Sequence, residues 1–284
     1  MDNIIDARVC PPIEAFVNDR TWADLQGTLR GVRERGWTVP PSMAAPSMDA
    51  YLSDCAAAGV RQAGLAARVP NDLWGGQGND PVFAAVEDRP EFFHACGAVD
   101  AFDPDPEVTI ARLRARGARG IVVEPGLAGT PVHLDDPVVD PVYDACQSAG
   151  LPLLLMGGGE TGPDLSYSDP LRHERVAIRF PRLDIIYVHG GWPFVQEALG
   201  VAFRRRNVWM MPDVYFPGLP GEHDYLLAMR TYLQDRFLFA SNYPYCPLPE
   251  IVDRYHGFGL PDDVLGKVLH DNAARVFGLE PRVV

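Results

Sequence analysis

One stretch constrains the fold more than any other, residues 183–195 with the sequence LDIIYVHGGWPFV. Its apolar run ends at a single histidine, His189, which two glycines and the start of a helical pattern follow. A continuous apolar run between structure breakers is typical of a parallel strand that is covered on both faces. Folds with such strands place their chemistry at the strands' carboxyl ends. His189 is therefore the first candidate catalytic residue.

Strand-like runs recur along the whole chain, with helical patterns between them. Besides the run before His189, strands are expected at 3–9, 60–68, 92–99, 120–124, 152–156, 208–211 and 236–241. Eight strands that alternate with helices over 284 residues predict an α/β fold, a single distorted (β/α)8 TIM barrel spanning residues 1–284. The alternative is a doubly wound open sheet, which the number of expected strands disfavours.

Helices are expected between the strands, at 48–58, 80–89, 105–116, 140–150, 169–179, 193–206, 225–234, 248–255 and 261–277. Residues 11–46 are rich in Gly and Pro and less regular, so we expect an excursion with one or two short helices. Trp22, Trp37 and Trp74 lie in this excursion and in the loop after the second strand. They form either a lid over an aromatic substrate or simple packing onto the barrel, and packing is the preferred interpretation.

Composition bounds the partners and the location. The formal net charge of −13 disfavours binding to a nucleic-acid backbone or to an anionic membrane. Five scattered cysteines without a C-x-x-C pair favour reduced thiols over a disulfide framework. No long apolar segment is visible, so we expect a cytoplasmic protein with no membrane partner.

In a barrel, the residues at and just past the strand ends share one mouth. The candidates there are Arg8, Cys10, Arg68, Asp100, Glu124, Met156, Glu160, His189, Asp213 and Asn242. Such a mixture suits a small acidic molecule, although any one of these residues could instead belong to a salt bridge at the rim. The predicted substrate-binding residues are Cys10, Arg68, Glu124, Met156, Glu160, Trp192 and Tyr243. Cys10 is either a nucleophile with a lowered thiol pKa or a small buried thiol.

Several motifs together resemble one family. They are IIDARV, GLPLLLMGGG, FPRLDIIYVHGGWPF, DRFLFASNYP and LHDNAARVFGL, and they cover nearly the whole chain. In these motifs the chain is similar to the amidohydrolase-related group of the amidohydrolase superfamily, to which aminocarboxymuconate-semialdehyde decarboxylase belongs. The resemblance implies a distorted (β/α)8 barrel and a homodimer.

The resemblance also implies a divalent metal, commonly zinc, held by an Asp-x-His-x-His motif, a strand-five His and an Asp after strand eight. In this chain Arg8 and Cys10 stand where the two histidines belong, Met156 stands at the strand-five position, and Asn242 replaces the aspartate. Only His189 matches the family pattern. Since zinc needs three or four imidazole, thiolate or carboxylate ligands, we expect no catalytic metal and no other cofactor.

The expected function is metal-independent hydrolysis of a small carboxylated, cyclic or aromatic substrate such as a lactone. The resemblance allows this, because some members of the wider group work without a metal, for instance lactonases that act on dicarboxylated pyrones. His189 is the expected general base, Arg8 the anion anchor and Asn242 an orienting hydrogen-bond donor, with Asp213 or Glu160 as a second proton-transfer group. One alternative is a decarboxylase or another lyase of the same family. Another is a non-catalytic barrel that binds a ligand or an assembly partner.

Overall fold

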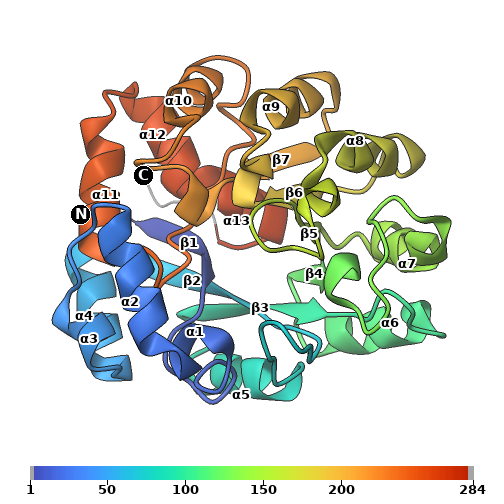
Figure 1. Cartoon of the computed structure of the whole chain (residues 1–284), viewed down its shortest axis with the longest axis horizontal. Coiled ribbons are helices and arrows are strands. Elements are labelled where there is room, and N and C mark those ends of the chain that lie inside the picture. Colours follow the sequence, from blue (N-terminus) through green and yellow to red (C-terminus); the bar gives the residue numbers. More distant parts are fainter. Residues whose placement is uncertain (1–2, 281–284) are drawn as a thin grey trace.

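A computed structural model describes residues 3–280 and shows a parallel sheet surrounded by helices (Figure 1). Its strands are β1 (Ile4–Val9), β2 (Val60–Ala66), β3 (Phe93–Ala98), β4 (Gly120–Val123), β5 (Leu153–Met156), β6 (Ile185–Val188) and β7 (Val208–Met211). The strands are neighbours in sequence order, and all neighbouring pairs are parallel. This order, with helices between the strands, is that of a TIM barrel, so the predicted fold class is confirmed.

The helices that follow or connect the strands are α4 (Met48–Ala58), α5 (Asp80–Asp88), α6 (Pro106–Ala115), α7 (Asp140–Ala149), α8 (Pro170–Arg179), α9 (Val195–Arg204), α10 (Glu222–Arg230), α11 (Leu248–Gly257), α12 (Asp262–Gly266) and α13 (Asn272–Phe277). Their ends follow local chemistry. The Ser47 side chain accepts the Ala50 N–H at the start of α4, and Gly59 ends that helix with a left-handed φ of 78°. Within residues 3–280, no helix has the length and apolarity needed to cross a membrane.

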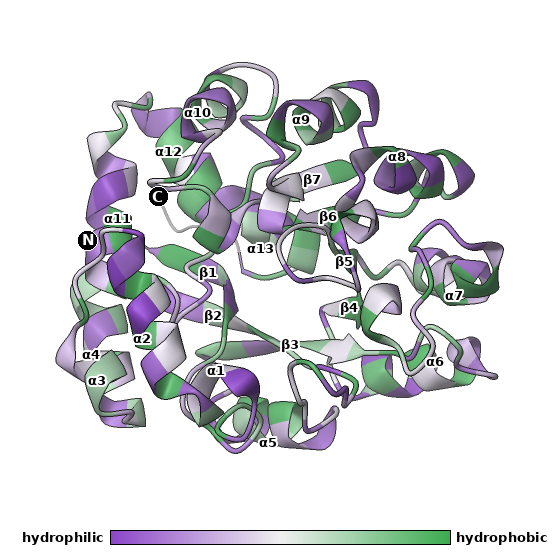
Figure 2. Ribbon diagram, in the orientation of Figure 1, coloured by the Kyte–Doolittle hydropathy of each residue, from purple (hydrophilic) through white to green (hydrophobic). Residues whose placement is uncertain are grey.

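The core has two parts because the sheet is buried on both faces. In β6, Ile186 and Val188 belong to a cluster inside the barrel, whereas Ile185 and Tyr187 belong to a larger cluster that includes residues of the surrounding helices. This alternation follows from the two-residue period of a strand. In Figure 2 the helices around the sheet carry both hydrophilic and hydrophobic residues, as expected for helices with one face on the core and one in solvent.

The excursion between β1 and α4 is more helical than the sequence indicated. It contains α1 (Arg20–Ala23), α2 (Leu25–Glu34) and α3 (Pro41–Ala44). Trp22 and Trp37 are buried, and the Trp22 indole donates to the carbonyl of Cys10 at 2.9 Å. These two rings therefore pack the excursion onto the barrel, beside the carboxyl end of β1.

The predicted eighth strand, 236–241, is wrong as a regular strand. The segment is extended and bonds to both neighbours: Leu238 N–H donates to Met210 O at 2.9 Å, and Ala7 N–H donates to Phe239 O at 3.0 Å. A single bridge joins Phe237 to Met210. The ladder is interrupted because the Asp6 carboxylate, rather than a backbone carbonyl, accepts the Ser241 N–H at 2.9 Å. Residues 236–241, the closing segment, nevertheless connect β7 to β1 and close the ring.

Candidate active site

A cavity of about 110 Å³ opens where the loops after the strands converge. The predicted residues that line it are Arg8, Cys10, Arg68, Glu124, Met156, Glu160, His189 and Asn242. Each of them ends a strand, or lies in the loop that follows a strand or the closing segment. The shared mouth of a barrel therefore brings together side chains that are up to 234 positions apart in the sequence.

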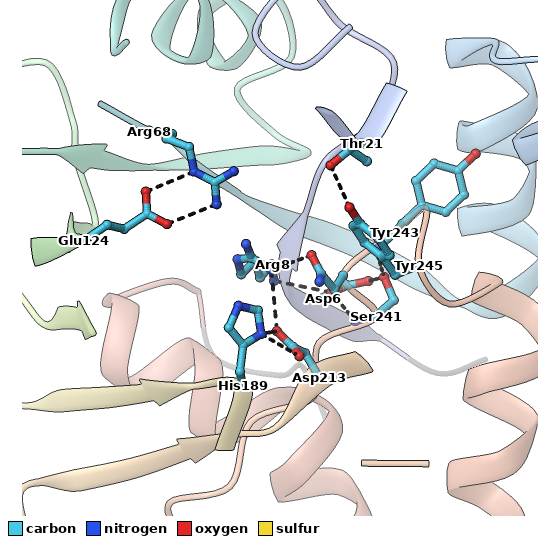
Figure 3. A network of polar contacts seen from close by, with 11 residues as sticks. Asp6, Arg8, Thr21, Arg68, Glu124, His189, Asp213, Ser241, Tyr243 and Tyr245 are labelled. Carbon is cyan, nitrogen blue, oxygen red and sulfur yellow. Dashed lines mark hydrogen bonds and ion pairs between the residues drawn. The ribbon is translucent and has the colours of Figure 1, made fainter. Parts of the chain in front are cut away.

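Four predicted residues do not line this cavity, and one of them, Asp100, lies in a separate hollow that Glu124 also borders. Asp213 is fully buried and contacts His189 (Figure 3). Trp192 stacks on Tyr215 with ring centroids 5.2 Å apart, and Tyr243 is fully buried and donates its hydroxyl to the carbonyl of Ser42 at 3.1 Å. The structure thus does not place Trp192 and Tyr243 as substrate contacts, because their large rings are used in packing.

His189 and Asp213 form the central pair. The imidazole Nδ1 lies 3.0 Å from Oδ1 and 2.9 Å from Oδ2 of Asp213 (Figure 3). Since an ionised carboxylate only accepts hydrogen bonds, a neutral His189 ring carries its proton on Nδ1. The other nitrogen, Nε2, then holds a lone pair and is the ring atom available to a molecule in the cavity.

The backbone at this site adopts an unusual conformation. His189, Asp213 and Asn242 have φ angles of 64°, 41° and 49°, and they are the non-glycine residues with positive φ in the described part of the chain. Each stands at a sharp turn: η4 (His189–Gly191) follows β6, η5 (Asp213–Tyr215) follows β7, and Asn242 follows the closing segment. Left-handed residues of this kind concentrate at functional sites, where the surrounding structure holds them in place.

Arg8 extends the pair into a larger polar network. Its Nη1 donates to Asn242 Oδ1 and, at 3.5 Å, to Asp213 Oδ2. The side chain is 5% exposed, and its Nε has no hydrogen-bond partner among the described residues. Asn242, predicted as a hydrogen-bond donor, therefore accepts a hydrogen bond in this structure and orients the guanidinium.

Asp6 supports this network from beneath. It is fully buried, and its carboxylate accepts the Ser241 hydroxyl at 2.5 Å, the Ser241 N–H at 2.9 Å and the Arg8 N–H at 3.4 Å. Burial raises the pKa of Asp6 to about 7, against the lowering effect of these hydrogen bonds. Asp6 therefore joins β1 to the closing segment and sets the backbone position of Arg8.

Ion pairs form one wall of the cavity. Arg68 donates to both oxygens of Glu124, at 2.9 Å and 3.0 Å (Figure 3), and Arg20 contacts Glu160 at 2.6 Å. The Trp74 ring lies against both guanidiniums, 4.8 Å from that of Arg20 and 5.4 Å from that of Arg68. Trp74 thus contributes to the lining, in contrast to the two buried tryptophans of the excursion.

The Cys10 thiol lines the cavity, but its environment does not activate it. Burial raises the pKa of Cys10, and the opposing charges of Arg8 and Arg68 do not offset that rise. The thiolate is the reactive form of cysteine. Cys10 is therefore protonated at neutral pH, which favours the interpretation as a small buried thiol over that as a nucleophile.

Some lining residues were not predicted as site residues from the sequence: Thr21, Arg35, Trp74, Thr161, Val214, Tyr215 and Tyr245. Tyr215 and Tyr245 lie two and three positions after Asp213 and Asn242, so a longer search past each strand end would have found them. Thr21 and Arg35 come from the excursion, where no strand pattern indicates a direction. The Tyr245 hydroxyl meets the Thr21 hydroxyl at 3.0 Å and so ties the excursion to the mouth.

Comparison with known proteins shows the family to which the chain belongs. The family model described as Amidohydrolase matches residues 40–279. An uncharacterised TIM-barrel protein from Bordetella bronchiseptica is 34% identical over 97% of this chain and 98% of its own, with a TM-score of 0.92. 5-Carboxyvanillate decarboxylase from Novosphingobium aromaticivorans, solved with manganese and 4-hydroxy-3-methoxy-5-nitrobenzoic acid, is 19% identical (98% and 96% covered, TM-score 0.66). A probable 2-pyrone-4,6-dicarboxylic acid hydrolase from Acinetobacter baumannii, with citric acid bound, is 14% identical (98% and 100% covered, TM-score 0.58). The curated protein sequences contain no significant match.

The bound manganese corrects one prediction. We expected no cofactor because four expected ligand positions hold Arg8, Cys10, Met156 and Asn242. This expectation is contradicted by decarboxylases of the same fold that contain manganese. Water and substrate oxygens contribute to the coordination of such ions, so the loss of single ligand positions does not rule out a metal.

The side chains around His189 do not by themselves fit such an ion. In residues 3–280, no three His, Cys, Asp or Glu side chains are grouped so that they could hold a metal. The Arg8 guanidinium contacts Asp213 and would repel a divalent cation there. The reaction steps assigned to this cavity therefore use this chain's own residues.

Proposed function

The chain belongs to the amidohydrolase family, and we propose that it is a hydrolase of a small carboxylated, cyclic or aromatic substrate such as a lactone. The observation that carries the proposal is the buried Asp213 carboxylate on Nδ1 of His189, a residue that lines the cavity, because this contact leaves Nε2 as the ring nitrogen that can act as a base. A histidine oriented in this way by a carboxylate is a recurrent means of activating a nucleophile.

In the proposed reaction, His189 Nε2 takes a proton from water as the water oxygen attacks the lactone carbonyl. The imidazolium that forms is stabilised by Asp213 at 2.9 Å. The tetrahedral intermediate then collapses, the ring C–O bond breaks, and the imidazolium returns the proton to the leaving oxygen. Asp213 is buried behind His189 and acts through it, so it is a positioning residue rather than a second proton donor to the substrate.

Arg8 supplies the electrostatic part. Its guanidinium is held by Asn242 and Asp213, and it presents a fixed positive charge at the mouth beside His189. A charge that needs no reorganisation stabilises the oxyanion of the intermediate as it forms. Glu160, which lines the cavity but is paired with Arg20, remains the candidate for a second proton transfer.

A second candidate function is decarboxylation. It is favoured by the names of solved structures with the same fold, which include 5-carboxyvanillate and 2,6-dihydroxybenzoate decarboxylases. Protonated His189 would then deliver its Nε2 proton to the ring carbon that loses carbon dioxide. The two functions use the same residues and differ in their products.

Product analysis tests the proposal. The protein is incubated with a panel of carboxylated lactones and hydroxybenzoates, each with and without added Mn²⁺, and the products are identified by mass spectrometry and carbon dioxide release. We expect a ring-opened acid, and we expect the His189→Ala variant to retain its circular dichroism spectrum but to lose turnover by at least about 100-fold. Release of carbon dioxide with the decarboxylated ring, and without any ring-opened acid, would show that the reaction is decarboxylation and not hydrolysis. Full activity of the folded His189→Ala variant would contradict both functions as assigned to this site.

A further inference from the structure

The charges around the cavity are balanced except at Arg35. The carboxylates there have cationic partners, in the pairs Glu124 with Arg68, Glu160 with Arg20, and Asp213 with Arg8 and His189. Arg35 also lines the cavity, and no carboxylate lies within ion-pair distance of it among residues 3–280. The cavity therefore has one positive charge more than its own acidic side chains neutralise, in a protein whose net charge is −13.

The Arg35 guanidinium is held in place by one hydrogen bond and has no acidic partner. Arg35 follows the last turn of α2, and its Nη2 donates to the carbonyl of Tyr245 at 2.8 Å. Its Nε is buried and has no hydrogen-bond partner in the described part of the chain. A guanidinium that is anchored through Nη2 and has no acidic partner keeps its charge for a carboxylate in the cavity.

The Arg35 charge also acts on Tyr215, whose ring contacts the catalytic base. Burial raises the pKa of Tyr215 to about 12, and the nearby Arg35 charge opposes that rise. The Tyr215 ring in turn meets the His189 ring edge-on, with centroids 5.3 Å apart. Arg35, Tyr215 and His189 thus line one cavity of about 110 Å³, so a single small molecule bound there can contact both Arg35 and His189.

We propose that Arg35 is a specificity-determining residue, which binds a carboxylate of the substrate other than the group that reacts at His189. This inference rests on the proposed function of the same cavity. It assigns separate tasks to the two arginines. Arg8, committed to Asn242 and Asp213, stabilises charge at the reacting group, whereas Arg35 selects a substrate with a further anionic group.

Substitution of Arg35 separates binding from chemistry. With the substrate found in the product screen, Arg35→Met should raise KM by about 10- to 100-fold and change kcat by less than about threefold, since a charge-assisted contact is lost away from the reacting group. Arg35→Lys should raise KM less, because it keeps the charge but not the planar fork. The control is Arg33→Met, which removes the same charge from an exposed position of α2 and should leave KM unchanged.

A binding measurement keeps the test independent of turnover. Isophthalate and benzoate are titrated against each protein and followed by the fluorescence of Trp74 and the other tryptophans. Wild type should bind isophthalate at least about 10-fold more tightly than benzoate, and Arg35→Met should lose this preference. Equal binding of the two acids by wild type, binding of neither, or a folded Arg35→Met variant that keeps the preference would overturn the role of Arg35. If His189→Ala still abolished turnover in those cases, the proposed function would stand without this inference.

Discussion

His189, Asp213 and Asn242 come from three different turns, yet all three are in the left-handed backbone region. For non-glycine residues this conformation costs on the order of 1 kcal/mol each. The side-chain contacts explain why it is kept: the pair of His189 with Asp213, and the bond from Arg8 to Asn242, both depend on the direction in which these backbones project their side chains. These three residues thus lower the stability of the protein and in return fix the geometry of the site.

Asp6 lies two positions before Arg8 in β1, and its contacts are structural. Its carboxylate bonds to Ser241 and to the Arg8 N–H and meets no solvent. Asp6 therefore joins β1 to residue 241 and does not line the cavity.

The raised pKa of Asp6 predicts a pH-dependent stability. Because the folded-state pKa of about 7 lies above the unfolded value, the folded chain retains a proton that the unfolded chain releases above pH ~4. The Asp6 contribution to the free energy of unfolding is therefore greatest at low pH and is lost as the pH rises towards 7. Relative to wild type, Asp6→Asn should gain up to about 4 kcal/mol between pH 4 and pH 7.5, measured by urea unfolding.

The matched control is Asp253→Asn, which removes an exposed carboxylate from α11. Its stability relative to wild type should stay within about 0.5 kcal/mol over the same pH range. An Asp6→Asn curve that runs parallel to that of wild type would contradict a raised pKa for Asp6.

At the scale of single elements, η4 is the turn that positions the base. Gly190 follows His189 with a φ of 62°, and a Cβ added there would lie 2.6 Å from the Pro212 Cβ and 2.8 Å from the Pro212 Cα. Tyr225 donates its hydroxyl to the Gly190 carbonyl at 3.0 Å. The loop after β7 therefore leaves no space for a side chain at Gly190. The close packing of Gly190 against Pro212 and Tyr225 holds the turn that positions the His189 backbone.

Gly190→Ala should accordingly destabilise the protein by about 2–4 kcal/mol and lower kcat by at least about 10-fold, since the turn must move. Gly200→Ala in the next helix, α9, is the control: no atom lies within 4 Å of its added Cβ. That exposed helical site should gain about 0.5–1 kcal/mol with unchanged activity. Urea unfolding and steady-state kinetics measure both effects, and a fully active, fully stable Gly190→Ala protein would contradict the role given to η4.

At the scale of the whole molecule, periodicity predicts the barrel well because buried parallel strands leave apolar runs that few other structures produce. The strand at 208–211 and the helix at 48–58 have the predicted bounds. The closing segment differs since Asp6 replaces a ladder partner, a contact across 235 positions that no local pattern shows.

The candidate site, too, could be predicted from the sequence only in part. Arg8, His189 and Asn242 were found because each stands at a strand end, where the fold determines the neighbourhood. Arg35 was not, because it enters from the excursion and its approach depends on how Trp22 and Trp37 pack. The predicted homodimer and cytoplasmic location remain predictions, as does the choice of lactone over other carboxylated substrates.

The most direct test of the account is a double-mutant cycle on the central pair, with kcat/KM measured for His189→Gln, Asp213→Asn and the double variant. Asp213 also contacts Arg8, but at 3.5 Å, so we expect its main effect to pass through His189. Each single variant then loses at least about 100-fold, and the double variant is no more than about threefold slower than His189→Gln. Losses that multiply in the double variant would show that Asp213 has a task of its own, and an Asp213→Asn enzyme with full activity would remove the pair from the mechanism.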